Sequence, residues 1–454
     1  MPSVAQKDEL SELVSSIHSA AADLASVCEK RQLPQPSSSS SSSSSSAPAP
    51  RVDLTLENAP YFDAKAALVD AAEQLVRLVR GPREQLLALS FEHCATASLQ
   101  VILKYKLAGH IPLEGATTYE AIARAMGRPE VQPALVARIL EHAASYGLFR
   151  VRPGGLVAHN ATSALLVTDP DLEAWMDLSA TVAYPAGASI PRALERYGYS
   201  MEADEAPYGV SIGRNVSQFQ RFREADGTRL HEMFARAMRG IAAGGAYDFR
   251  HAVDGGYPWH ELQDRAGHLV VDVGGGPGHV SVALADKYPG LRFEVQDLPE
   301  TAAVGEESCP EALRARVGFR AHDFMTPQPP HDVADGEGIA YFCRFILHDW
   351  SDKYARKILQ GLASALRPQD RIIVNEVVVP DPGTETRERE RRMHDRDMLM
   401  LMNLNGRERT RAAFEDLCRS VTPQLRVHRI YRPDQGELSL IEIVRSDSTL
   451  WMAP

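Results

Sequence analysis

The side chains in this sequence best suited to proton transfer are one histidine and two glutamates. An apolar run ends at Leu347, His348 follows directly, and the next residues have the apolar spacing of a helix. His348 is therefore expected at the carboxyl end of a strand, where open α/β sheets bind their ligands. A carboxylate on Nδ1 of such a histidine would fix its tautomer and leave Nε2 to take a proton. Glu376, which closes the next predicted strand, is placed for that role, and Glu408 lies further on in NGRERT.

Each of these residues also has a simpler interpretation. His348 could be a loop histidine that only satisfies its own hydrogen bonds. Glu376 or Glu408 could form a salt bridge with a nearby arginine, and Arg407 and Arg409 adjoin Glu408. The residue types alone do not decide between these interpretations, so the surrounding pattern has to.

A glycine-rich turn is the second feature that could bind a ligand. VDVGGGPGHV contains Gly274, Gly275 and Gly276, which let a backbone approach a ligand closely and adopt positive φ. A dinucleotide turn of the form G-x-G-x-x-G/A would need a small residue where His279 stands, and the G-K-[ST] phosphate loop is absent. The pattern D-x-G-x-G-x-G instead resembles the first motif of class I methyltransferases.

Acidic residues follow the predicted strand 291–295 and the segment 317–321, where a third strand could end. Asp297 could accept both hydroxyls of a ribose, or it could cap a helix that starts at Leu298. Asp323 and Phe324 could hold an adenine amino group and cover its ring, or they could belong to a surface loop.

The elements that must position these residues are short apolar runs alternating with helical stretches from about 246 to 445. Such alternation predicts a doubly wound α/β domain, with a mostly parallel sheet and helices on both faces. The predicted parallel strands are 268–273, 291–295, 339–346 and 371–379. A closing antiparallel pair is predicted at 425–431 and 437–444, on either side of the turn at 433–436.

The preceding part of the chain is mainly helical. Thr117 and Glu120 form a capping box that predicts a helix over 119–126, and a second apolar stripe runs from 135 to 146. A short hairpin over 151–158 completes the order of a winged helix. The second helix carries no basic recognition face, so we expect dimerisation rather than DNA binding.

These patterns divide the chain into four segments. An amphipathic helix is predicted within 1–33, and a flexible Ser/Pro-rich linker covers 34–57. A helical winged-helix domain is predicted over 58–245, and the α/β domain over 246–454.

Composition excludes several classes of protein. The net charge of −11 argues against nucleic acid as a partner. Five scattered cysteines without a CxxC pair indicate reduced thiols, and no unbroken run of eighteen apolar residues predicts a membrane span. No secretory signal is recognised, so a cytoplasmic location is expected. Four His-Asp dipeptides lie on separate elements without metal-ligand spacing, so no metal is expected.

The motifs VDVGGGPG, QDLPE, LHDWSD and NGRERT together resemble the caffeic-acid type of O-methyltransferase, which needs no metal. The resemblance runs from about Ala64 to the C-terminus and is closest to fungal enzymes that methylate polyketides or other secondary metabolites. It implies S-adenosylmethionine as cofactor and a homodimer in which the winged helix closes the partner's pocket. The polyserine linker departs from the family pattern.

The resemblance also assigns roles to residues. His348 takes that of the base, with Glu376 and Glu408 flanking it. The implied cofactor contacts are Gly274, Gly275, Gly276, Asp297, Leu298, Asp323, Phe324 and Arg344, the last at a position that is often lysine. The implied substrate contacts are Phe234, Met238, Met398, Met402 and Asn403, each of which would be read as simple core without the family.

The sequence therefore predicts an enzyme that methylates a hydroxyl, expected to be phenolic, of a small aromatic metabolite. The alternative is a catalytically inactive methyltransferase fold that serves as a binding or regulatory protein. NAD-linked redox chemistry remains formally open, whereas a metal-dependent hydrolase is disfavoured by the spread of the His-Asp pairs.

Overall fold

The computed structural model describes residues 4–36, 52, 58–224, 227–243, 245–264, 268–334, 337–433 and 436–448. The chain forms two compact units, and each is described by itself. The N-terminal unit comprises Met1–Ala188 and Phe219–Gly244, and the C-terminal unit comprises Ser189–Gln218 and Gly245–Pro454. Most of the predicted linker at 34–57 lies outside the described residues.

Residues 189–218 differ from the predicted division, which places them in the helical domain. They belong with the C-terminal unit because they bond to the start of a helix there. Ser351 donates to the carbonyl of Met201 at 2.7 Å, and the Tyr354 hydroxyl donates to Glu202 at 2.6 Å. These contacts span about 150 positions, so no local sequence pattern signals them.

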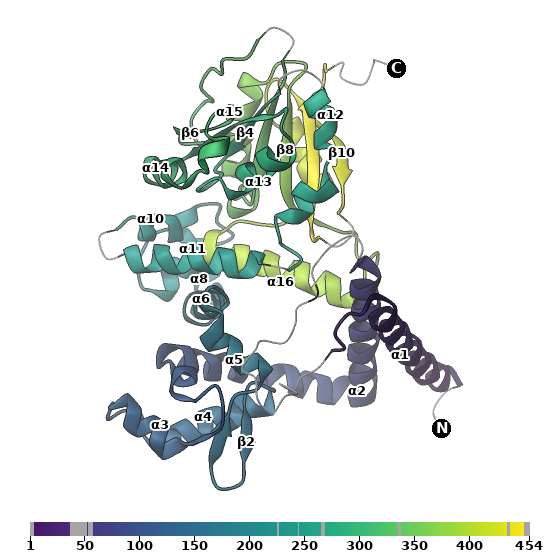
Figure 1. The fold of residues 1–454 in the computed structure, drawn as a ribbon, viewed down its shortest axis with the longest axis vertical. Helices are drawn as coiled ribbons and strands as arrows, with labels where there is room; N and C mark the ends of the chain where they lie inside the picture. The colour runs from purple at the N-terminus through teal and green to yellow at the C-terminus, as the bar shows by residue number, and fades with distance from the viewer. Residues whose placement is uncertain are drawn as a thin grey trace. The chain divides into compact units, whose positions relative to one another are not determined.

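Two long helices open the N-terminal unit (Figure 1). α1 (Val4–Arg31) confirms the predicted first helix and packs against α2 (Ala59–Lys104). α2 is interrupted at Gly81, where φ is 68°, because the following Pro82 cannot donate to a regular helix. By length and composition alone α2 would qualify as a membrane span, although the sequence has no unbroken apolar run of that length.

The predicted winged helix is present in the N-terminal unit. α3 (Tyr119–Met126) has the predicted bounds, but its N-cap is Thr118, whose side chain accepts from the Ala121 amide at 3.2 Å. The predicted cap at Thr117 is therefore wrong by one residue. α4 (Pro133–Ser145) follows, and β1 (Thr117–Thr118), β3 (Leu156–Ala158) and β2 (Arg150–Arg152) form a sheet in that order.

The remaining elements up to residue 264 are short helices. Those of the N-terminal unit include η2 (Leu107–His110), α5 (Ala161–Thr168), α6 (Pro170–Leu178), η3 (Ser179–Ala183), α7 (Tyr184–Gly187) and α11 (Thr228–Ala242). The C-terminal unit has α8 (Ile190–Tyr197), η4 (Ala203–Glu205), α9 (Pro207–Ser211), η5 (Ala252–Gly256) and α12 (Trp259–Asp264), while α10 (Gln218–Phe222) crosses the boundary.

The C-terminal unit is built on one sheet with strand order β10-β11-β8-β7-β4-β5-β6 (Figure 1). The parallel strands are β4 (Leu269–Val273), β5 (Arg292–Asp297), β6 (Val317–Ala321), β7 (Ile339–Arg344) and β8 (Arg371–Val379). β11 (Leu438–Arg445) pairs antiparallel with both β8 and β10 (Leu425–Tyr431), which confirms the predicted closing pair. The short β9 (Arg409–Thr410) pairs parallel with the end of β8.

Helices cover both faces of this sheet because its strands are apolar on both sides. Along β4, Val271 and Val273 pack into one apolar cluster with Ile358 of α15 (Asp352–Ala365), whereas Val270 packs into another with Leu284 of α13 (His279–Lys287). Successive side chains of a strand point to opposite faces, so each face needs its own cover. The other helical segments are α14 (Pro299–Ser308), η6 (Glu311–Leu313), η7 (Leu347–Asp349), α16 (Arg387–Leu404) and α17 (Arg411–Arg419).

Candidate active site

His348 lies in a one-turn helix at the end of the central strand β7. The chain leaves β7 through Phe345, which has a left-handed φ of 54°, and enters η7. Oε1 of the buried Glu376 accepts the backbone N–H groups of Ile346, Leu347 and His348 at 3.1, 2.5 and 3.2 Å. The prediction that Glu376 binds Nδ1 of the imidazole is therefore wrong, because its carboxylate holds the backbone of this turn.

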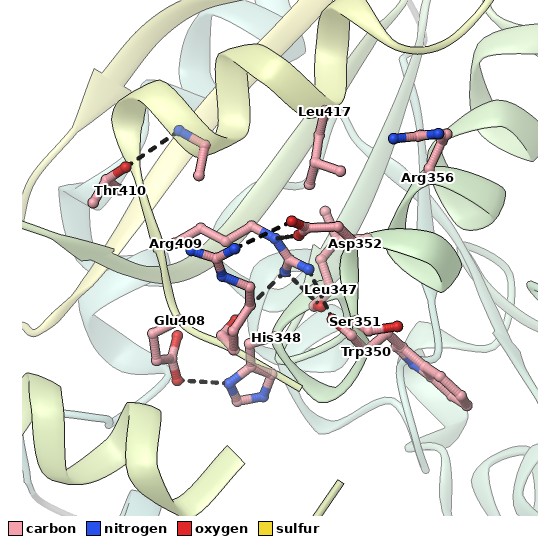
Figure 2. Close-up of polar contacts among 12 residues, drawn as sticks. Leu347, His348, Trp350, Ser351, Asp352, Arg356, Glu408, Arg409, Thr410 and Leu417 are labelled. Carbon is pink, nitrogen blue, oxygen red and sulfur yellow. Dashed lines mark hydrogen bonds and ion pairs between the residues drawn. The ribbon is translucent and has the colours of Figure 1, made fainter. Parts of the chain in front are cut away.

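Glu408 is the carboxylate that contacts the imidazole. Its Oε1 lies 2.8 Å from His348 Nδ1, and both side chains are buried (Figure 2). The segment that carries Glu408 is fixed to η7 by backbone contacts: the amide of Arg407 donates to the His348 carbonyl at 2.9 Å. A Cβ on Gly406 would come within 2.2 Å of that same carbonyl oxygen, so the approach requires glycine.

Arg409 completes the attachment. Its buried guanidinium donates to the carbonyls of Leu347 and Trp350 at 2.7 Å each and to Asp352 at 3.0 Å (Figure 2). Arg407 also pairs with Asp352, at 3.2 Å. The adjacent arginines therefore do not neutralise Glu408; Arg396 of α16 does, at 2.9 Å from Oε1.

The charges around His348 favour a polarised histidine–carboxylate pair. Burial acts to raise the pKa of Glu408, but His348 and Arg396 outweigh it and hold that pKa below its usual range. Burial acts to lower the pKa of His348, but Glu408 and Asp349 outweigh it and raise the value. An ionised Glu408 can only accept, so Nδ1 carries the proton in the neutral ring and Nε2 is the basic nitrogen.

Asp349 lies beside that basic nitrogen. Its Oδ1 is 3.3 Å from His348 Nε2, and burial raises its pKa to about 6. An ionised Asp349 would stabilise an imidazolium that forms when Nε2 accepts a proton. No role in the site is predicted for Asp349 from the sequence, because nothing local shows that its side chain turns back onto its neighbour.

The glycine turn lies between β4 and α13, as predicted. Gly274, Gly276 and Gly278 have φ of 68°, 60° and 80°, which L side chains rarely adopt. A Cβ on Gly274 would come within 2.5 Å of Ile346 and one on Gly275 within 2.5 Å of the Asp272 carboxyl. A Cβ on Gly276, by contrast, would have no atom of the described residues within 4 Å, apart from the glycine itself and its two chain neighbours. Gly274 and Gly275 are thus packed against the protein interior, whereas the space next to Gly276 is open.

Asp297 and the turn are joined directly. Oδ2 of Asp297 accepts the Gly276 amide and Oδ1 accepts the Leu298 amide, both at 2.8 Å. The N-cap of α14 is Leu298, without a side-chain capping bond, so the interpretation of Asp297 as the helix cap is wrong; its contact with a ribose stays a prediction. Leu298 itself is 39 % exposed and occupies the N-cap position of that helix.

The remaining predicted cofactor residues, Asp323, Phe324 and Arg344, all make contacts within the protein. Oδ1 of Asp323 accepts the Met325 amide at 2.9 Å, and the Phe324 ring meets Trp350 edge to face. Arg344 donates to Asn375 at 2.5 Å and to the Tyr247 carbonyl at 2.6 Å, and burial lowers its pKa to about 10. These contacts fix the Arg344 side chain within the protein, and its contact with the cofactor stays a prediction.

Comparison with known proteins shows the family of this chain. A model of the O-methyltransferase domain matches residues 264–421, and a model of the O-methyltransferase dimerisation domain matches 87–169. The chain is 68% identical to O-methyltransferase CTB2 of Cercospora beticola, over 96% of this chain and 93% of the relative. The chain belongs to the O-methyltransferase family.

Further relatives agree. The methyltransferase is 57% identical to O-methyltransferase elcB of Phaeosphaeria nodorum, over 83% of this chain and 87% of that one. OxaC, solved in complex with SAH and oxaline, shares the fold with a TM-score of 0.70 at 20% identity, over 97% and 99% of the two chains. The protein is therefore an S-adenosylmethionine-dependent O-methyltransferase of fungal secondary metabolism.

The residues of this methyltransferase fit that cofactor. The opening at Gly276 lies beside the Asp297 carboxylate, which can still accept ribose hydroxyls because a carboxylate has about four acceptor sites. The Phe324 ring lies near Gly274 of the same turn, because a Cβ on that glycine would come within 3.3 Å of it. Among the residues that the structure describes, no group of three His, Cys, Asp or Glu side chains is arranged to hold a metal.

The predicted substrate residues fall into two groups. Met398, Met402 and Asn403 lie on α16 of the C-terminal unit, whereas Phe234 and Met238 lie on α11 of the N-terminal unit. Asn403 is buried, and its Oδ1 finds no hydrogen-bond partner within the part of the chain that the structure describes. An amide oxygen left in this way is a candidate for a substrate hydroxyl.

Proposed function

We propose that this methyltransferase modifies a phenolic hydroxyl of a small aromatic secondary metabolite, such as a polyketide, with His348 as the general base. The observation that carries the proposal is the buried contact of 2.8 Å between His348 Nδ1 and Glu408. It leaves Nε2 as the basic nitrogen at the end of a central strand, next to the glycine turn in the same sheet.

His348, Glu408 and Asp349 together can take up the proton that the substrate hydroxyl loses. S-adenosylmethionine, when bound, supplies the methyl group. The substrate hydroxyl gives its proton to Nε2, and the resulting imidazolium is stabilised by Glu408 and Asp349. A phenol of pKa about 10 and a histidine near 6.5 differ by about 3.5 units, or roughly 5 kcal/mol. Proton loss therefore accompanies attack, and the two carboxylates reduce the mismatch by raising the pKa of His348.

The predicted substrate contacts support an aromatic acceptor. Met398 and Met402 are adaptable apolar side chains that suit flat, polarisable rings. The unsatisfied Oδ1 of Asn403 suits a second hydroxyl on the same ring system. Phe234 and Met238, on α11 of the N-terminal unit, are proposed as further substrate contacts. Because residues 87–169 match the dimerisation domain, we further propose that the protein is a homodimer. Sedimentation analysis of the full chain would test this.

Methyl transfer from labelled cofactor to a panel of phenols tests the proposal, with aliphatic alcohols, amines and thiols as comparison acceptors. We expect phenols to be labelled, and His348→Ala to lower kcat by about 10²- to 10⁴-fold while cofactor affinity by calorimetry stays unchanged. An unchanged rate in His348→Ala would remove the histidine from the mechanism. Cofactor binding without transfer to any acceptor would favour the inactive binding protein.

A further inference from the structure

Two adjacent residues of α16 hold Glu408 against the imidazole. Nε of Arg396 donates to Glu408 Oε1 at 2.9 Å, the same oxygen that lies 2.8 Å from His348 Nδ1. Oδ1 of Asp397 accepts the backbone N–H of Glu408 at 2.8 Å. One carboxylate oxygen therefore joins the imidazole and a guanidinium, and the helix fixes both the backbone and the side chain of Glu408.

Aromatic rings hold Arg396 in this position. Its guanidinium carbon lies 4.4 Å from the centroid of the Tyr247 ring and 4.5 Å from that of Phe345. The Phe345 ring stacks on His348, with centroids 5.1 Å apart and an interplanar angle of 22°. The Arg396 side chain is 11% exposed, so it cannot swing into solvent without leaving both rings.

We propose that Arg396 is a positioning residue for proton transfer: by sharing Glu408 with His348, it orients the carboxylate on Nδ1 and keeps the imidazole neutral between turnovers. This inference rests on the proposed role of His348 as the base. Arg396 belongs to none of the motifs that carry the family resemblance.

The balance of charge around His348 explains why a cation is needed there. The charged groups packed around it are Asp349 in η7, Glu376 from β8, Glu408 and Arg409 from the segment before α17, Arg396 from α16, and Arg344 across the Phe345 ring. The carboxylates of Glu408 and Asp349 favour the imidazolium, which cannot accept a proton. Arg396 opposes them and limits the rise in the pKa of His348.

The test is the titration of His348 in the full chain carrying 13C-labelled histidine. The resonance is assigned by its loss in His348→Ala. We expect Arg396→Met to raise the titration midpoint by about 0.5 to 1 unit, and Arg396→Lys, which keeps the charge, to stay near the wild type. Arg396→Gln keeps a hydrogen-bond donor but removes the charge. If the methionine variant does not fold, the titration midpoint is measured in Arg396→Gln, where the same rise is expected. Arg411→Met, at an exposed arginine paired with Glu415, is the matched control and leaves the midpoint unchanged.

The activity profile supplies an independent readout. The acid limb of kcat against pH should move with the midpoint, so Arg396→Met loses about three- to tenfold at pH 6.5 and little at pH 9. An unmoved midpoint, or an equal loss of kcat at every pH, would overturn the inference and leave Arg396 a structural residue. If the wild type labels no phenol, the proposed function fails, while the titration still decides the inference.

Discussion

The contrast between Glu408 and Glu376 gives the sharpest test of the site, because Glu408 makes the contact with His348 Nδ1 that the sequence predicts for Glu376. Glu408→Gln replaces the carboxylate on His348 Nδ1 with a neutral group of nearly the same shape. Glu376→Gln makes the same chemical change at a side chain whose oxygen accepts three backbone N–H groups.

The expected magnitudes follow from these contacts. The contact between Glu408 and His348 is 2.8 Å long and shielded from water, and such charge-assisted bonds contribute about 1.5–3 kcal/mol. At about 1.4 kcal/mol per factor of ten, Glu408→Gln should lower kcat by roughly 10- to 150-fold. A glutamine carbonyl at 376 can still accept the backbone bonds, so kcat should stay within about threefold. Because burial raises the pKa of Glu376, removing its charge should also not lower thermal stability.

The assay is the initial rate of methyl transfer from labelled cofactor, at saturating cofactor and acceptor, with cofactor affinity measured by calorimetry in each variant. Equal affinities show that the change lies in proton transfer and not in the cofactor site. A larger loss of kcat in Glu376→Gln than in Glu408→Gln would refute the assignment of Glu408 to Nδ1.

Three further predictions concern the residues around the base. Asp272 is buried under the glycine turn with its pKa raised from 3.8 to about 6 by burial, so it contributes stability that is lost as pH rises through this window. Asp272→Asn keeps the bond from Ser281 and should gain up to about 3 kcal/mol in unfolding free energy over wild type between pH 4 and 7.5; parallel stability curves would contradict this. Gly274→Ala places a Cβ 2.5 Å from Ile346 at a residue with positive φ, so it should lower the unfolding free energy by about 1–3 kcal/mol and weaken cofactor binding. Thermal melts with and without cofactor measure both effects. An unchanged Tm would show that the turn relaxes around the new methyl group. Asn403→Leu removes an unsatisfied buried amide, so KM for the acceptor should rise about tenfold while Tm holds; a lower Tm with unchanged KM would make Asn403 a core residue.

The fold of the C-terminal unit could be predicted because its signals are local. The parallel strands β4, β5, β7 and β8 lie on the predicted apolar runs, whereas β6 is only partly apolar and is followed by a loop, so it was not among the predicted parallel strands. The predicted strand at 339–346 ran two residues too far, since Phe345 adopts positive φ and ends β7 at Arg344. The assignment of 189–218 failed for the opposite reason: its place depends on contacts with α15, far along the chain.

The sequence by itself determined the chemistry available: a histidine at a strand end, glycines at a turn, and carboxylates at neighbouring strand ends, each set by patterns of a few residues. Only the tertiary structure decided which carboxylate meets which atom. Glu376 and Glu408 are both glutamates near the same edge of the sheet, and no spacing rule separates a side chain that binds backbone from one that binds an imidazole. That choice depends on Gly406 and Arg409 fixing the segment before α17 to η7, and on Arg396 approaching from another helix. Such contacts between distant elements are satisfied by packing, which leaves no periodic trace in the sequence.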